Sequence, residues 1–280
     1  MLMLASAATV VVRDDTAVQC GVDSRRVGII EVPRPAAVAA VLCLARQPLP
    51  RAELIARLRA TGMPDLAATA LVQELEDYRV LRRPPGAEVA ITILGRSPLA
   101  RLSAALLREE GWRVRRPFSA DPADLRQAPG PVLVVDCAAH YARLTPLLLR
   151  HCPTFLPALL IDAHGLIGPA RIAGVGACPL CQVLHHHEED PKWFSVLAQA
   201  QGQVHEAAHA PVAALHATAA RLCACAAWLA GGQPEPPGHP DMELTPGEVL
   251  RLDPYSPAPM ERREILGPHP RCAWCRGSVD

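Results

Sequence analysis

Four cysteines form two pairs with the same spacing, far apart in the chain. Cys178 and Cys181 stand in "GVGACPLCQVLHHHEED", and Cys272 and Cys275 stand in "HPRCAWCRG". A CxxC pair places two thiolates at about 2.3 Å from one ion, and two such pairs complete a closed tetrahedral site. Because no position is left open to water, such a site is structural. The spacing therefore predicts a structural Zn2+ held by all four cysteines.

Other chemistry is open to these thiols. The pairs could be redox dithiols, an iron–sulfur site, or two unrelated turns with free thiols. Redox chemistry favours a CxxC that directly precedes a helix in a thioredoxin-like βαβ unit, and we expect neither pair to do so. Ten cysteines without a secretory context indicate a reducing cytosol, where close thiol pairs favour metal over disulfides.

The remaining ligand-type residues are weaker candidates. His185, His186 and His187 compete as ligands, but three consecutive side chains cannot all face one ion, and "HHHEEDPKW" is typical of a solvated loop. The other six cysteines should pack as small hydrophobic side chains. They are Cys20, Cys43, Cys137, Cys152, Cys223 and Cys225.

A second candidate site lies in "TILGRSPLARL", where an expected strand turns into a helix. A nucleotide-binding G-x-G-x-x-G/A loop would put Gly95 and Ser97 on its first two special positions. Ser97 adds a side chain where phosphate needs bare backbone, and Pro98 lacks an N–H donor. Asp136 ends a buried strand, either facing a ligand or capping the next turn. We expect Gly95, Ser97 and Asp136 to form a vestigial nucleotide site without ATP.

The elements that position these residues fall into two domains. Residues 1–85 show two short strands, three helices and a final strand, a winged-helix-like α+β pattern. Residues 86–280 alternate strand and helix, which is typical of an α/β protein with a parallel, Rossmann-like sheet. A long Ala-rich helix stops at Gly231–Gly232, and a Pro-rich tail carries the last two cysteines.

Composition excludes several classes of partner. The 28 basic and 28 acidic residues cancel, and Lys192 is the only lysine. Charge balance, and the alternating Arg and Glu of the N-terminal helices, argue against a nucleic-acid partner. A winged-helix DNA-binding regulator stays an alternative. The start "MLMLASAATVVVRDD" lacks the basic n-region of a signal peptide, and we expect no membrane-spanning stretch. The expected location is cytoplasmic.

These motifs resemble a known family. The glycine loop, "VVDC" at the end of a strand and two CxxC knuckles separated by a long helix resemble the ThiF-type, ubiquitin-activating-like adenylyltransferases. The segment "GLIGPARIAGVGACPLCQVLHHHEEDPKW" is similar to a divergent actinobacterial branch, described as ThiF-like cyclodehydratase components or leader-peptide-binding partners of YcaO enzymes in thiazole/oxazole-modified peptide (bacteriocin) biosynthesis. The resemblance implies a ThiF-type fold with a four-thiolate zinc, a homodimer, and an N-terminal unit that grips a leader peptide by strand addition.

The chain departs from the active members of that family. They carry a glycine-rich ATP loop, a downstream Arg-Gln pair and "DCTDN", where this chain has "DCAAH". Ala139 occupies the position of the second aspartate in that motif, so a magnesium ligand is missing. Charge neutralisation at the α-phosphoryl group is therefore lost. The sequence therefore favours a non-catalytic scaffold for a peptide or protein. The alternative is a residual ATP-dependent adenylyltransferase.

Overall fold

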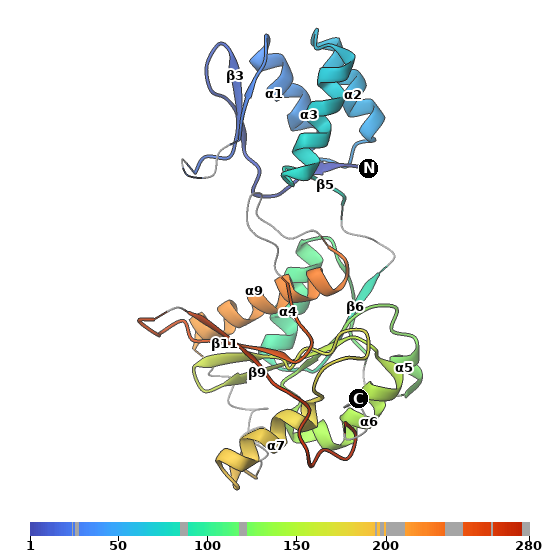
Figure 1. Ribbon diagram of the computed structural model, residues 1–280, viewed down its shortest axis with the longest axis vertical. Helices are drawn as coiled ribbons and strands as arrows, with labels where there is room; N and C mark the ends of the chain where they lie inside the picture. The colour runs from blue at the N-terminus through green and yellow to red at the C-terminus, as the bar shows by residue number, and fades with distance from the viewer. Residues whose placement is uncertain are drawn as a thin grey trace. The chain divides into compact units, whose positions relative to one another are not determined.

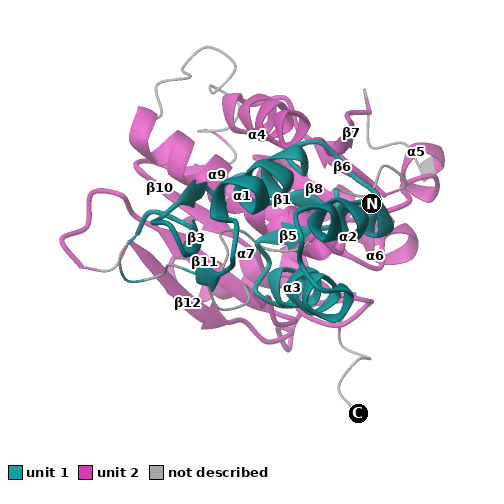
Figure 2. Cartoon of the chain, turned by 90° about the horizontal axis from the view of Figure 1, so that it is seen from above, with its two compact units in different colours: residues 1–86, 233–242 teal, residues 87–232, 243–280 magenta. Residues whose placement is uncertain are grey.

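The computed structural model describes residues 1–23, 25, 28–84, 89–117, 122–193, 195–196, 199, 211–232, 243–258 and 260–275. The chain forms two compact units (Figure 2). Unit 1 comprises Met1–Gly86 and Gln233–Met242, and unit 2 comprises Ala87–Gly232 and Glu243–Asp280. The domain boundary expected between residues 85 and 86 lies outside the described part of the chain.

Unit 1 combines a three-stranded antiparallel sheet, three helices and a two-stranded sheet. The strand orders are β2-β3-β4 and β1-β5. The elements are β1 (Met3–Leu4), β2 (Val10–Val12), β3 (Ala17–Cys20), β4 (Gly28–Glu31), α1 (Pro35–Leu44), α2 (Arg51–Ala60), α3 (Asp65–Asp77) and β5 (Leu81–Arg82). The three helices and the strands β3, β4 and β5 agree with the sequence-based expectation. The winged-helix likeness stays a prediction.

Proline sets the start of each helix in unit 1. Pro35 opens α1, and Pro50 and Pro64 are the N-caps of α2 and α3. Proline suits these positions because its fixed φ is helical and its missing N–H would have no partner there. The helices bury leucines such as Leu54 and Leu58, both fully buried, in one core shared with residues of the strands. Each such burial contributes about 1.5–3 kcal/mol.

The arginines of α2 are paired with carboxylates. Three ion pairs neutralise them: Arg57–Glu53 at 2.7 Å, Arg51–Glu76 at 2.9 Å and Arg59–Asp65 at 3.1 Å. A DNA-recognition helix would instead present unpaired basic side chains to phosphate.

Unit 2 is a seven-stranded mixed sheet, in the order β12-β11-β10-β9-β8-β6-β7. The strands are β6 (Ala90–Leu94), β7 (Arg113–Arg115), β8 (Val132–Val135), β9 (Phe155–Ile161), β10 (His164–Ile167), β11 (Glu248–Leu252) and β12 (Glu261–Ile265). The expected parallel sheet is right for β7, β6, β8 and β9 and wrong for the rest, which are antiparallel. The direction reverses because only Asp162 and Ala163 separate β9 from β10, and two residues cannot make a crossover.

Helices cover both faces of this sheet (Figure 1). The helices α4 (Pro98–Glu109) and α9 (Val212–Leu229) lie together on one face. The other face carries α5 (Pro122–Arg126), α6 (Tyr141–His151) and α7 (Pro179–Glu189), with the short 3-10 turn η1 (Ala138–His140) before α6. The arrangement buries near-continuous apolar strands on both sides, as in other α/β folds.

The long helix α9 corrects the expectation that no stretch of the chain is long and apolar enough to span a membrane. Its 18 residues have a mean hydropathy of 1.4, so by length and composition it could cross a membrane. In the structure it is a core helix, packed against α4 and β10. A Cβ at Gly165 of β10 would lie 2.1 Å from Oγ1 of Thr218, so glycine there permits this close approach. The packing is consistent with a soluble protein.

Candidate metal centre and remnant nucleotide loop

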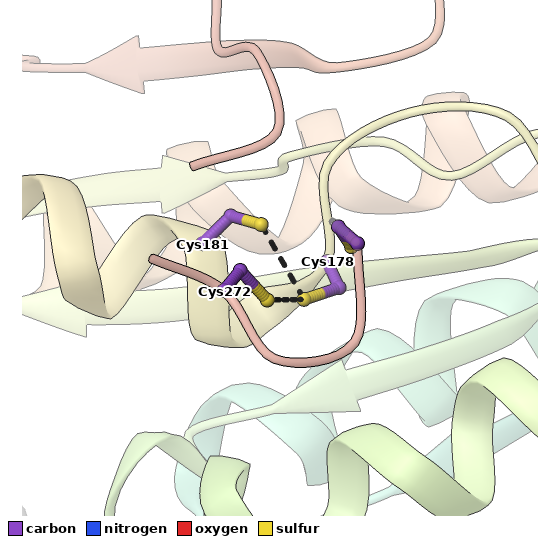
Figure 3. Close-up of side chains that lie close together, drawn as sticks. Cys178, Cys181 and Cys272 are labelled. Carbon is purple, nitrogen blue, oxygen red and sulfur yellow. Dashed lines mark hydrogen bonds between the residues drawn. The ribbon is translucent and has the colours of Figure 1, made fainter. Parts of the chain in front are cut away.

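The cysteines of the two CxxC pairs form one buried cluster (Figure 3). Sγ of Cys178 lies 3.6 Å from Sγ of Cys181 and 3.6 Å from Sγ of Cys272. The sulfurs of all four, Cys275 included, lie within 4.8 Å of one another. A disulfide would need about 2.05 Å, whereas sulfurs around a tetrahedral zinc are about 3.8 Å apart. The spacing fits a metal ion.

Local structure places each pair. Cys178 is the N-cap of α7, Pro179 takes the first helical position, and the N–H of Cys181 donates to the Cys178 carbonyl at 3.0 Å. Cys272 and Cys275 follow β12 in the tail, and all four cysteines are at most 2% exposed. The apolar side chains around them are Leu149, Leu180 and Leu184. Water is excluded, so four thiolates would leave an ion no open position.

One expectation about this segment is wrong. The helix α7 includes His185–His187, which were expected in a solvated loop. Its first turn overlaps the first CxxC, but the strands before and after it, β10 and β11, pair antiparallel, so this is no thioredoxin-like βαβ unit. Buried Pro179, Cys181 and Val183 hold α7 against the domain and override the polar composition of its last turn. Since Cys178 and Cys181 meet the second pair, a metal centre explains the site better than two separate dithiols.

The histidines of α7 have partners of their own. Nε2 of His185 lies 3.1 Å from the Gly267 carbonyl. The ring of His186 stacks on Trp193 with centroids 4.4 Å apart, and desolvation by burial lowers its pKa.

The thiols of the cluster differ in the direction of their pKa shifts. The thiol of Cys178 has a raised pKa because of its hydrogen bonds to the sulfurs of Cys181 and Cys275. Hydrogen bonds with Cys178 and Cys181 lower the pKa of Cys275 to about 4. The cluster therefore holds a thiolate at neutral pH, which is the form that binds a cation.

The loop that the sequence predicted as a vestigial nucleotide site brings Gly95, Ser97 and Asp136 together. Gly95 has φ 132°, and a Cβ there would lie 2.3 Å from the Val135 carbonyl, so the strand ends meet too closely for any other residue. Ser97 caps α4, and its Oγ accepts the N–H of Ala100 at 3.2 Å. Packing and capping thus account for both residues without a phosphate.

The carboxylate of Asp136 also has hydrogen-bond partners within the protein. Its Oδ1 accepts the N–H of Leu160 at 2.9 Å, and Ser97 supplies a second hydrogen bond. Burial nevertheless raises the pKa of Asp136, against the effect of these bonds. The neighbouring thiol of Cys137 donates to the Val135 carbonyl, and burial raises its pKa to about 12, so it is no nucleophile at neutral pH.

Substitution of Asp136 tests this structural role. Asp136→Asn keeps an acceptor for Leu160 and tolerates the left-handed backbone at φ 49°, so its free energy of unfolding should stay within about 1 kcal/mol of wild type. Asp136→Ala leaves a buried N–H unpaired and should cost about 1–3 kcal/mol. Urea denaturation measures both. Equal losses in the two variants would contradict the assignment.

The pH dependence adds a second readout for Asp136. The pKa of Asp136 is raised in the folded state. The contribution of this carboxyl group to the folding stability of wild type is therefore complete below the ordinary pKa of 3.8, and it is lost as the pH rises through the folded-state pKa. The amide side chain of the Asp136→Asn variant does not titrate. The stability of this variant relative to wild type should therefore increase across that range.

Sequence reasoning missed the contacts that join the tail to α7. Glu188 lies within ion-pair distance of both His269 and Arg271. The only local signal is the position of His269, three residues before Cys272.

No protein-family model matches the sequence, and no curated protein matches it. Similar solved structures include a heterocyclase in complex with substrate and cofactor (TM-score 0.61, 15% identity) and the heterocyclase TruD (TM-score 0.58, 13% identity). Each alignment covers 98% of this chain but only 39% and 42% of the heterocyclases, so the chain spans about two fifths of their length. The microcin C7 biosynthetic enzyme MccB, in complex with N-formylated MccA, aligns with a TM-score of 0.47 at 13% identity, over 98% of this chain and 99% of MccB. Over nearly its whole length this chain shares a fold with these heterocyclases.

Proposed function

We propose that this chain is a non-catalytic ThiF-like scaffold that binds a leader peptide through residues 1–85 and presents it to a peptide-modifying partner enzyme. The observation that carries the proposal is the remnant loop. The N–H of Ala100 is taken by Ser97, Pro98 has none, and the Asp136 carboxylate holds the Leu160 amide. These are the groups that a nucleotide would need.

Adenylation requires a phosphate cradle and a magnesium ion. The cradle is a set of free N–H groups at a helix N-terminus, and here capping consumes part of that set. The ion needs carboxylates, and Ala139 offers none at the second position. The same fold with its phosphate chemistry removed supports a binding role.

The free edge of β4 supports peptide binding. Within the described residues, β4 pairs with β3 on one side and ends the sheet on the other. The N–H of Val32 points to β3, since it donates to the Thr16 carbonyl at 2.8 Å. Because the direction alternates along a strand, the N–H and C=O groups of Ile29 and Glu31 point outward. An extended peptide can pair with such groups as an added strand.

Side chains beside that edge indicate what the peptide carries. Ile29 is 49% exposed and shares a cross-strand row with Gln19 and Val11, and Val11 is also exposed. An added strand would place one side chain next to Ile29 in this row. We propose that this side chain is apolar.

The kind of partner enzyme is proposed from the family resemblance alone. We propose that an enzyme of the YcaO type, which that resemblance implies, supplies the cyclodehydration chemistry. A cytoplasmic location and a homodimer belong to the same proposal.

The metal centre has a structural task in this scheme. We propose that Zn2+ is held by Cys178, Cys181, Cys272 and Cys275, since four buried thiolates are a zinc donor set. The ion would fasten the tail to unit 2 and would take no part in chemistry.

Two assays test the proposal on the full chain. A displayed library of random peptides, selected against the immobilised protein, should yield binders with an apolar residue in an extended segment. ATP with Mg²⁺ should give neither binding in a titration nor pyrophosphate exchange. Failure to select any peptide would reject the scaffold role, and exchange above background would favour an adenylyltransferase.

A further inference from the structure

Three more side chains gather beside the four cysteines, between α7 and the tail. One ligand-type atom each of His185, Glu188 and His269 lies within 4.8 Å of the others. Nε2 of His269 is 2.9 Å from Oε1 of Glu188, and the two imidazole rings meet edge to face with centroids 4.7 Å apart. Two imidazoles and one carboxylate are a known zinc donor set, so a second ion has to be considered.

The contacts of His269 argue against an ion. Its Nδ1 accepts the N–H of Arg271 at 3.0 Å, so the neutral ring carries its proton on Nε2. A protonated nitrogen has no lone pair for a metal, and Nε2 is the atom that faces Glu188. Nη2 of Arg271 lies 3.2 Å from the same carboxylate oxygen and adds positive charge at the place of a cation.

The cluster instead joins the two halves of the cysteine site. Cys181, His185 and Glu188 lie at i, i+4 and i+7, so they share one face of α7. The tail meets this face at Gly267, whose carbonyl is 3.1 Å from His185, and at His269 beside Glu188. The first cysteine pair and the carboxylate thus belong to one rigid helix.

His269 shapes the turn that carries the second pair. Its carbonyl accepts the N–H of Cys272 at 2.9 Å, and its ring accepts the N–H of Arg271. The residue is only 2% exposed. The place of this ring therefore fixes where the turn to Cys272 begins, and Glu188 is the group on α7 that faces the ring.

We propose that Glu188 is a positioning residue of the metal centre, which holds the second cysteine pair against α7 through His269 and Arg271. The four sulfurs then converge before an ion arrives. The contact with buried His269 matters most, because Glu188 and Arg271 are more than half exposed and water screens that pair. The N–H of His269 is not well aligned for a hydrogen bond, so the attraction is between carboxylate charge and ring dipole.

Cobalt(II) is the probe, because a four-thiolate site gives it an intense sulfur-to-metal absorption band. Wild type should bind one ion per chain. Glu188→Ala should release cobalt to excess EDTA about 10-fold faster, the low end of effects on residues that orient ligands. Glu188→Gln keeps an acceptor and should fall between the two. The band itself should be unchanged, since the same four sulfurs bind.

Glu189→Ala is the matched control, on the same helix but beside His186, with 78% of its side chain exposed. Its release rate should equal that of wild type. Equal release from Glu188→Ala and wild type would overturn the proposal. So would two ions per wild-type chain with one lost in Glu188→Ala, which would make the cluster a second metal site. A chain that binds no cobalt overturns it as well, whatever the peptide selection finds.

Discussion

Cys272→Ser should leave the purified protein without its metal and lower the thermal unfolding midpoint of unit 2 by about 10–20 °C. A structural zinc in a small peptide contributes about 10–16 kcal/mol, and unit 2 has a core of its own, so we expect a loss of several kcal/mol. Elemental analysis and calorimetry measure the two effects. Wild type treated with a strong chelator should unfold at the same temperature as the variant.

Cys43→Ala provides the control for that experiment. Cys43 is half-buried in unit 1 and belongs to neither CxxC pair. This variant should keep one metal ion per chain and the unfolding midpoint of unit 2. A stoichiometric ion retained in Cys272→Ser, or wild type without metal, would contradict a four-thiolate centre.

Ile29→Pro should weaken the binding of a selected peptide by about 10- to 100-fold. The N–H of Ile29 points away from β3, so proline leaves the β3–β4 ladder intact and removes a donor from the free edge. The lost hydrogen bond and the ring beside the added strand together amount to about 1.4–2.8 kcal/mol. Fluorescence anisotropy with a labelled peptide from the library measures the affinity.

Val12→Pro is the matched variant on the opposite edge of the same sheet. Val12 is 49% exposed, as Ile29 is, and its N–H also points outward, because the N–H of Arg13 donates to the Ala17 carbonyl. This variant should bind the peptide as wild type does. If both prolines weaken binding equally, the peptide does not dock on β4; if neither does, strand addition is wrong.

Short sequence patterns predicted those elements whose structure depends on a few neighbouring residues. The glycine loop, the strand ending at Asp136 and the helices of unit 1 each follow from a few neighbouring residues, and the structure contains them. The strands β1 and β2, of two and three residues, were not predicted. The antiparallel half of the sheet escaped because pairing direction depends on the partner strand.

The metal centre could likewise be predicted only in part from the sequence. The repeated CxxC spacing was enough to predict that the four sulfurs meet, since few other arrangements explain it. The helix α7 was missed because its last turn, His185–Glu189, is polar and packs through contacts with Trp193 and with the tail. Glu188 and His269 are 81 positions apart and belong to no motif, so only a three-dimensional structure pairs them.

The two halves of the cysteine site are synthesised at different times. Cys178 and Cys272 are 94 residues apart, so a chain growing on the ribosome exposes the first knuckle long before the second exists. Until Cys275 has been translated, the four sulfurs cannot enclose an ion. With the proposed zinc site, metal capture would come late in biogenesis, and a bound ion would distinguish chains translated through both knuckles from those that stopped earlier.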